Sequence, residues 1–355
     1  MKKIAFCNQK GGVAKTTSAV NIAAYLALNN QRTLLIDLDP QANATSGVGI
    51  DKNNLQNSIY EVLQDRAGIE EATIKTSLEF LSIVPSNINL TGAEIEMVNV
   101  MSREYRLKKA LEKVKDKYDF VVLDCPPSLG LLTVNGLSAA DSVIIPIQCE
   151  YYALEGLSQL VNTVNLIKEN LNEHLQIEGV LMTLADYRTN LTKEVIEEVK
   201  QYFGDKVFNA VIPRTIKLTE APGFGKPIAL YSKESIGAKK YEEVTYEILN
   251  NNGLQPIINK GVIEKNTNKD NLTEEKEETK IETKQILEEE LEEKIKQEVV
   301  KPEETIKQNA FIDEEVKLSD SKEIMLFDKK NNIFDFNNLE HQKRDIINLE
   351  GKNEG

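Results

Sequence analysis

The chain has 355 residues and a formal net charge of −14, with a pI near 4.9. This balance argues against a protein coated in basic surface for nucleic acid, although residues 256–355, with 26 acidic and 17 basic side chains, carry most of the excess. Three cysteines without C-x-x-C spacing and two histidines make a zinc site or a Ser-His or Cys-His nucleophile a poor expectation. No apolar run approaches the roughly 18 residues that span a bilayer, so we expect a cytoplasmic protein without a membrane partner.

Short apolar runs rich in β-branched residues recur along the first part of the chain and predict strands. These runs lie at 4–7, 33–39, 80–85, 120–126, 142–148, 178–184 and 209–213. Helical patterns lie between them, at 15–29, 103–116, 152–170, 191–203 and 234–250. Most of the runs lack apolar/polar alternation, so both faces of their sheet are expected to be buried. The order predicts an α/β fold with a doubly wound, mostly parallel sheet flanked by helices.

The strand–helix pattern ends near Leu254, which predicts one domain over 1–254 and an acidic, low-complexity extension over 255–355. The extension is expected to be largely disordered, because its composition is charged and poor in apolar residues. Leu287, Leu291 and Ile295 repeat every four residues, which allows a short helix and a helical partner site. A later apolar island at 323–339 fits a docking segment or a merely sticky linker equally well.

The stretch "KGGVAKTT" (10–17) follows the first predicted strand and opens the first predicted helix. Two glycines remove side chains where the backbone bends toward a ligand, and the helix adds its positive N-terminal end. Lys15 would meet the β- and γ-phosphates, while the Thr16 hydroxyl would bind Mg²⁺ and the Thr17 hydroxyl would reach the α-phosphate. A plain glycine turn between a strand and a helix is the alternative.

Carboxylates follow two other predicted strands. Asp37 and Asp39 stand at the end of "LLIDLD", where a carboxylate can orient a water for attack on a γ-phosphate or hold magnesium through water. A solvated acid at the strand end is a plausible alternative for one of the two. Asp124 ends "FVVLD", the arrangement of an acid that binds Mg²⁺ through a water or through Thr16.

Five segments together resemble the ParA/Soj partition ATPases, in the wider group with MinD and the nitrogenase iron protein. They are "KGGVAKTT" (10–17), "DLDPQANATSG" (37–47), "DCPPSLGLLTVNGL" (124–137), "IPIQCEYYALEGLSQL" (145–160) and "TEAPGFGKPI" (219–228). The resemblance covers about residues 1–250. It implies a deviant Walker A ATPase that uses ATP and Mg²⁺, turns over slowly and forms a homodimer when ATP is bound.

The resemblance also implies roles for individual residues. Lys10 would cross the interface of the ATP-bound dimer to the partner's nucleotide, Gly11 would lie where the two subunits approach, and Asp39 would be the acid needed for hydrolysis. The implied catalytic residues are thus Lys10, Lys15 and Asp39. The nucleotide-binding set is Lys10, Gly11, Gly12, Val13, Ala14, Lys15, Thr16, Thr17 and, near the adenine, Pro213. The magnesium set is Thr16, Asp39 and Asp124, with the carboxylates acting through water.

Ala14 departs from the more usual "KGGVGKT" of the family. A methyl group there need not block phosphate binding if the local φ is negative. The substitution nevertheless leaves the shape of the loop and the rate of turnover as open questions.

The family binds DNA without sequence preference, and its basic contacts fall at Arg188 and Lys217. Lys193, Lys206 and Arg214 could extend that patch, although any single one could be an ordinary solvated charge. The implied function is ATP-driven chromosome or plasmid segregation on the nucleoid, with hydrolysis stimulated by a ParB/Spo0J-type centromere-binding partner. The acidic extension could compete with DNA for the patch.

Three other readings use related chemistry. A MinD-like membrane positioner needs a basic amphipathic C-terminal helix, whereas this sequence finishes in "DIINLEGKNEG". An iron–sulfur carrier needs a bridging cysteine loop in addition to Cys125. A cargo-positioning ATPase would use the same switch, and the sequence separates it least well from a segregation ATPase.

Overall fold

The computed structural model describes residues 1–150 and 155–257. The predicted extension therefore lies outside the described residues except for 255–257. Seven strands form one sheet: β1 (Lys2–Phe6), β2 (Thr33–Asp37), β3 (Ile74–Lys75), β4 (Leu81–Val84), β5 (Phe120–Asp124), β6 (Ser142–Gln148) and β7 (Gln176–Thr183). Their order is β3-β4-β2-β5-β1-β6-β7, and only the β3–β4 pair is antiparallel. The predicted doubly wound, mostly parallel sheet is confirmed.

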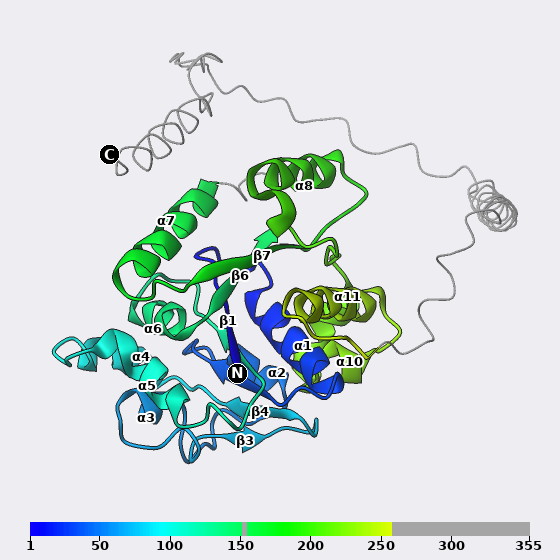
Figure 1. Ribbon diagram of the computed structural model, residues 1–355. Coiled ribbons are helices and arrows are strands. Elements are labelled where there is room, and N and C mark those ends of the chain that lie inside the picture. The colour runs from blue at the N-terminus through cyan, green and yellow to red at the C-terminus, as the bar shows by residue number, and fades with distance from the viewer. Residues whose placement is uncertain (151–154, 258–355) are drawn as a thin grey trace, which may run out of the picture. The chain divides into compact units, whose positions relative to one another are not determined.

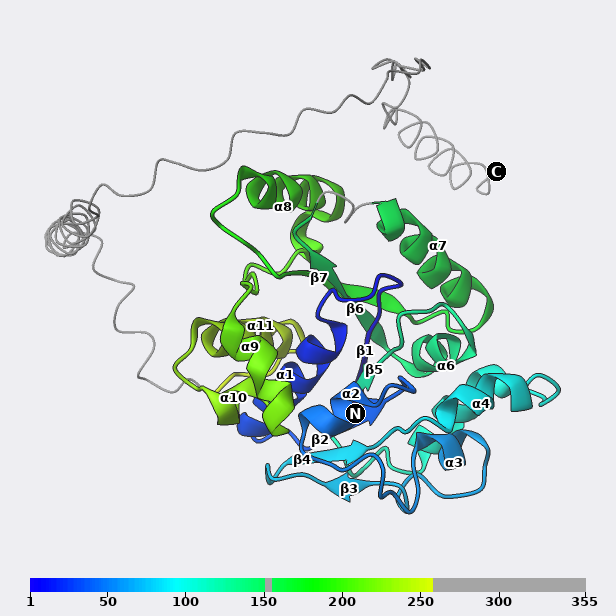
Figure 2. The same cartoon turned by 180° about the vertical axis from the view of Figure 1, so that it is seen from behind.

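Helices cover both faces of this sheet (Figures 1 and 2). They are α1 (Lys15–Leu28), α2 (Asn43–Gly47), α3 (Ile59–Leu63), α4 (Leu90–Glu96), α5 (Arg106–Glu112), α6 (Leu131–Ala139), α7 (Glu155–Asn170), α8 (Asn190–Phe203), α9 (Ile216–Glu220), α10 (Ile228–Tyr231) and α11 (Ile236–Asn251). Helices α1, α2 and α9–α11 share one apolar core with the sheet, and α3–α8 share the other. Alternate residues of a strand serve the two cores: Ile4 and Phe6 face the first, and Ala5 faces the second.

Helix α1, which follows the loop at 10–14, is largely buried between the sheet and its neighbouring helices. Its small residues, such as Ala19 and Ala23, are fully buried, which lets α11 pack closely against it. The Ser18 hydroxyl lies 3.1 Å from the hydroxyl of the fully buried Tyr241 on α11, so each polar group has a partner inside the core. This packing holds the loop that precedes α1 at a defined place on the sheet.

The strand predicted at 209–213 is wrong. The end of this run bonds the backbone of β7, where the Ile212 N–H donates to the Met182 carbonyl at 2.9 Å, and an isolated bridge joins Pro213 to Ala185 just past the strand. Earlier in the run, the backbone N–H groups of Asn209 and Ala210 both donate to the Glu247 carboxylate on α11, at 2.9 Å each. Because those donors are turned toward a helix, they are unavailable to a ladder.

Several short helices and strand β3 were not predicted, because their apolar patterns are too brief to show a period. Local capping marks some of them: Ser58 and Glu61 form a capping box at the start of α3. Within the described ranges, no helix is long and apolar enough to cross a membrane.

Candidate functional site

The loop from Cys7 to Ala14 leaves the carboxyl end of β1, at the centre of the sheet, and enters α1. Gly12 has φ 75°, and Ala14, the N-cap of α1, has φ 60° and ψ 31°. Ala14 is therefore in the left-handed region, so the condition under which its methyl would be harmless is not met. A left-handed non-glycine residue costs about 1 kcal/mol or more, and here the strain lies inside the loop itself.

Two side chains that the sequence analysis missed anchor this loop. The Thr183 hydroxyl, at the end of β7, bonds the Val13 carbonyl at 3.0 Å and the Ile147 carbonyl at 3.1 Å. Asn8 donates to the Pro146 carbonyl at 2.7 Å and accepts the N–H of Lys10 at 3.0 Å. The loop is thus tied to β6 and β7, whereas α1 has no side-chain cap and no acidic residue in its first turn. Its first N–H groups are left for an anion.

Lys15 and Asp124 are buried residues whose charges interact. Lys15 is 6% exposed, and its Nζ donates to the Lys10 carbonyl at 3.3 Å. Burial lowers the pKa of Lys15, against the opposing effect of the Asp124 charge. Asp124 is fully buried; burial, and then the neighbouring charge of Asp37, raise its pKa well above the ordinary range.

The two other acids at this edge have different environments. Asp37 is fully buried and satisfied: its Oδ2 accepts the N–H of Thr45 at 2.8 Å and the Thr45 hydroxyl at 2.7 Å. Burial raises the pKa of Asp37 to about 6, despite these hydrogen bonds. Asp39 is 8% exposed, and its Oδ1 accepts the N–H of Gln41 at 2.9 Å. Asp37 thus holds the chain in place, and the charge of Asp39 interacts with Lys15.

The donor set fits magnesium. Both carboxylate oxygens of Asp124 are buried without a hydrogen-bond partner among the described residues; Thr16 lies near enough to lower the pKa of Asp124 but without good hydrogen-bond geometry. Mg²⁺ prefers such oxygens and takes only one or two from the protein, with phosphates and waters supplying the rest. The described chain accordingly has no group of three or more His, Cys, Asp or Glu side chains placed to hold a metal.

The Lys10 side chain contacts an acid outside the phosphate loop. Its Nζ lies 3.9 Å from Glu150 Oε2, and both side chains are partly exposed. Glu150 also accepts hydrogen bonds from Arg214 Nη2, at 3.3 Å, and from Gln148 Nε2. The structure therefore brings Lys15, Thr16, Asp39 and Asp124 together and leaves Lys10 at the outer rim, in contact with an acid that the sequence analysis did not single out.

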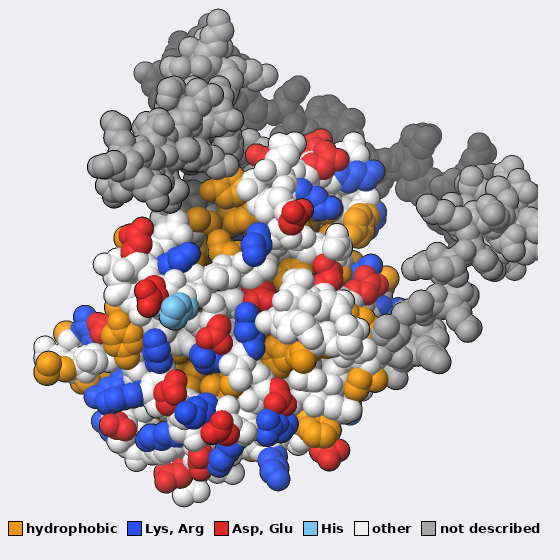
Figure 3. Space-filling view, in the orientation of Figure 1, with side chains coloured by type: hydrophobic (Ala, Val, Ile, Leu, Met, Phe, Trp, Pro, Cys, Tyr) orange, Lys and Arg blue, Asp and Glu red, His pale blue; other side chains and the backbone are white. Residues whose placement is uncertain are grey.

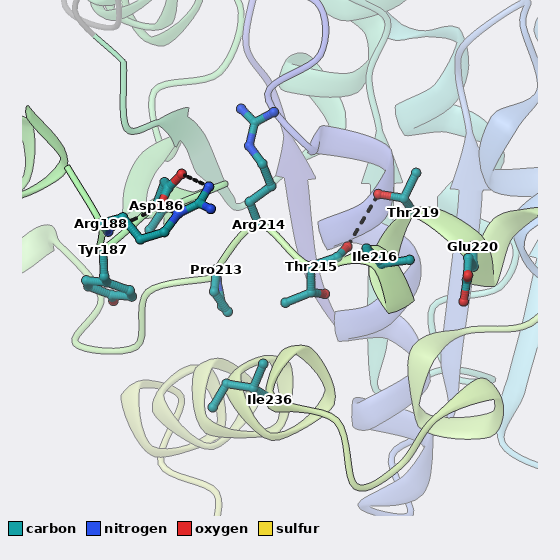
Figure 4. A pocket seen from close by; sticks show the side chains of 11 residues that line it. Asp186, Tyr187, Arg188, Pro213, Arg214, Thr215, Ile216, Thr219, Glu220 and Ile236 are labelled. Atoms are coloured by element: carbon teal, nitrogen blue, oxygen red, sulfur yellow. Dashed lines mark hydrogen bonds and ion pairs between the residues drawn. The ribbon is translucent and has the colours of Figure 1, made fainter. Parts of the chain in front are cut away.

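Pro213 lies in a different part of the site. It lines a cavity of about 780 Å³ between the end of β7, the chain before α9 and the start of α11 (Figure 4). The lining residues are Ala185, Asp186, Tyr187, Arg188, Pro213, Arg214, Thr215, Ile216, Thr219, Glu220 and Ile236. One of the two predicted DNA contacts, Arg188, belongs to this lining, and the other, Lys217, is bonded to a lining residue, Glu220, at 3.1 Å.

Comparisons with known proteins agree with this arrangement. A family model for an AAA domain matches residues 1–177. The chain is 56% identical over 250 residues to the sporulation initiation inhibitor protein Soj of Bacillus subtilis, covering 70% of this chain and 99% of that protein. It is 52% identical over 246 residues to the chromosome partitioning protein ParA of Myxococcus xanthus, covering 69% and 87%. A solved structure of cobyrinic acid a,c-diamide synthase from Mycobacterium smegmatis, with bound ATP analogue and magnesium, matches with a TM-score of 0.64 and 37% identity, over 73% of this chain and all of that one.

Proposed function

Since the chain belongs to the Soj/ParA family of chromosome-partitioning ATPases, we propose that it is an ATP-driven dimer switch that binds DNA and segregates a chromosome or plasmid. The observation that carries the proposal is the charge interaction between the buried Lys15 of the glycine loop and the buried Asp124, whose oxygens have no hydrogen-bond partner among the described residues, in a chain of this family. It is an ATPase that uses ATP and magnesium.

The nucleotide is held by the loop and its lysine. The free N–H groups at the start of α1 and the Lys15 ammonium bind the phosphates, and the Thr17 hydroxyl reaches the α-phosphate. Thr16 would hold magnesium directly, with Asp39 and Asp124 acting through water, and the bound ion would spread the charge of the phosphates during phosphoryl transfer. Pro213 contacts the adenine.

Hydrolysis requires a second subunit. Asp39 orients the attacking water, and Lys10 moves from its position beside Glu150 to the partner's nucleotide, with Gly11 at the point where the subunits meet. A cation delivered in this way stabilises phosphoryl charge only in the assembled dimer, as an arginine finger does. Because Lys10 is at the rim and its ion pair is exposed, the movement costs little.

The dimer binds DNA through Arg188 and Lys217, both exposed, without reading base sequence. Two subunits double the phosphate contacts, so ATP converts weak binding into useful binding. A ParB-type centromere-binding protein stimulates hydrolysis and releases the DNA. The proposed location is the cytoplasm, in association with the nucleoid.

The test compares DNA binding with ADP and with ATP in the full chain and in three variants. Wild type should bind DNA only with ATP, Lys15→Ala should not bind with either nucleotide, and Asp39→Ala should stay on DNA because it cannot hydrolyse ATP. Glu79→Ala, at an exposed acid far from the loop in sequence, is the matched control and should behave as wild type. DNA binding that ignores the nucleotide contradicts the switch.

A further inference from the structure

The basic side chains around the cavity are each held by an acid of the same chain. Arg188 pairs with Asp186, Arg214 with Glu150 and Lys217 with Glu220. Over the face drawn in Figure 3, basic and acidic side chains are intermingled. A region expected to meet DNA phosphates is therefore locally close to neutral.

The Arg188–Asp186 pair has the strongest geometry of the three (Figure 4). Arg188 Nε donates to Asp186 Oδ1 at 2.8 Å and Nη2 donates to Oδ2 at 2.6 Å, a bidentate contact. The guanidinium is otherwise open, with 88% of its side chain exposed. The pair lowers the pKa of Asp186 to about 2, so the acid is charged at neutral pH.

The Lys217–Glu220 pair is reinforced by an aromatic ring. Glu220 Oε2 accepts from Lys217 Nζ at 3.1 Å and from the Tyr231 hydroxyl at 2.8 Å. The Lys217 ammonium also lies 5.7 Å from the centre of the Tyr231 ring. Tyr231 thus holds the acid and the base together on the outer surface.

We propose that Asp186 and Glu220 set the affinity for DNA by competing with its phosphates for Arg188 and Lys217; this rests on the DNA-binding function proposed above. A basic side chain strengthens DNA binding mainly because it neutralises a phosphate and so releases counterions condensed on the DNA. A basic side chain already paired with a carboxylate of the protein releases fewer of these counterions. Each acid therefore lowers the affinity of a single subunit for DNA. Binding then depends on having two subunits, which is what makes it respond to ATP.

The turn at 186–189 is also held by hydrogen bonds that do not involve the Asp186 carboxylate. Thr189 caps α8 through the N–H of Thr192, and the Asp186 carbonyl accepts from both threonine hydroxyls. Asp186→Asn keeps one oxygen that can accept the backbone N–H of Arg188, but it removes the charge and the second acceptor of the guanidinium contact. The substitution is thus a test of electrostatics in a preserved turn.

The experiment measures the Kd of the full chain for a non-specific DNA duplex with ATP, over a series of salt concentrations. Asp186→Asn and Glu220→Gln should each lower the Kd by roughly three- to tenfold at low salt. Each should also steepen the slope of log Kd against log salt concentration by about one for each subunit. Glu112→Gln changes net charge equally at an exposed acid on α5 and should show neither effect.

A double-mutant cycle identifies the cause. If Asp186 acts through Arg188, Asp186→Asn should change nothing in an Arg188→Gln background. The proposal is overturned if the two acid variants bind no better than Glu112→Gln, or if the gain survives without Arg188. If wild type shows no ATP-dependent DNA binding at all, the proposed function is wrong, and this proposal is wrong for the same reason.

Discussion

Asp37 and Asp124 are paired in register on the adjacent parallel strands β2 and β5, so two fully buried carboxyl groups lie side by side at the carboxyl edge of the sheet. Only one of them is satisfied within the described chain. Asp37 is bonded to Thr45, whereas neither oxygen of Asp124 has a partner. Since an unpaired buried carboxylate is costly, we expect Asp124 to be the acid that binds a ligand, whereas Asp37 stabilises the fold through Thr45.

The first prediction concerns the support of Asp37. Thr45→Val removes the hydroxyl that donates to Asp37 and accepts the N–H of Ser86 at 2.9 Å. Because the Asp37 carboxylate and the Ser86 N–H are buried and would each lose a partner, the unfolding free energy should fall by roughly 2 kcal/mol, as measured by urea denaturation at pH 7. Thr45→Ser keeps the hydroxyl and should recover most of the loss. A smaller loss in Thr45→Val than in Thr45→Ser would contradict the prediction, because valine keeps the methyl group and lacks only the hydroxyl.

The second prediction concerns the strained residue in the loop. Ala14→Gly should raise the unfolding free energy by about 1 kcal/mol, because glycine adopts positive φ without a steric penalty. Ala42, with φ 55°, gives a second left-handed site where the same change should help. Ala44→Gly, inside helix α2, should destabilise instead. A loss of stability at Ala14 would show that its methyl makes contacts worth more than the strain.

The third prediction tests whether Lys10 acts across a dimer. Lys10→Ala and Asp39→Ala should each lose ATPase activity, but an equal mixture should recover up to about a quarter of the wild-type rate. In a mixed dimer, one site combines an intact Asp39 with an intact Lys10 from the other subunit. If Lys10 acts within its own subunit, every site in the mixture lacks one residue and no activity returns. Adding Lys15→Ala to both variants is the control, since it should abolish the recovery.

The fourth prediction concerns pH and the Glu178 ion pair. Burial by itself raises the pKa of Glu178, but the hydrogen bond and charge of Lys2, at 2.8 Å, bring it below the ordinary value of 4.5. The folded state therefore binds this proton less readily than the unfolded state. Its stabilisation is present above pH 4.5 and is lost as pH falls through the lower folded pKa.

Glu178→Gln should accordingly cost roughly 1–3 kcal/mol of unfolding free energy at pH 7, and this difference should shrink as the pH falls below 4.5. Glu173→Gln is the control, because Glu173 is 85% exposed and should show no cost. A difference between wild type and Glu178→Gln that does not vary with pH would contradict the assigned charge interaction.

The long, contiguous features of this protein could be predicted from its sequence. Unbroken apolar runs indicate buried parallel strands, and such runs correctly predicted six of the seven strands in the sheet. The loop at 10–17 and the acids at strand ends were predicted in the same way, because topology alone brings the carboxyl ends of β1, β2 and β5 together. What failed was the run at 209–213, where Glu247, far along the chain, takes the backbone donors that a strand would need.

By itself the sequence indicated which residues stand at the carboxyl ends of the strands, because that depends only on the position of each residue along its strand. Tertiary structure alone decided what each side chain does there. Asp37 is satisfied by Thr45, Lys10 faces Glu150, Arg188 is held by Asp186, and Ala14 is left-handed. Partners such as Glu150 for Lys10 are distant in sequence, and no local pattern records them. A backbone angle such as that of Ala14 follows from the path the loop must take between β1 and α1.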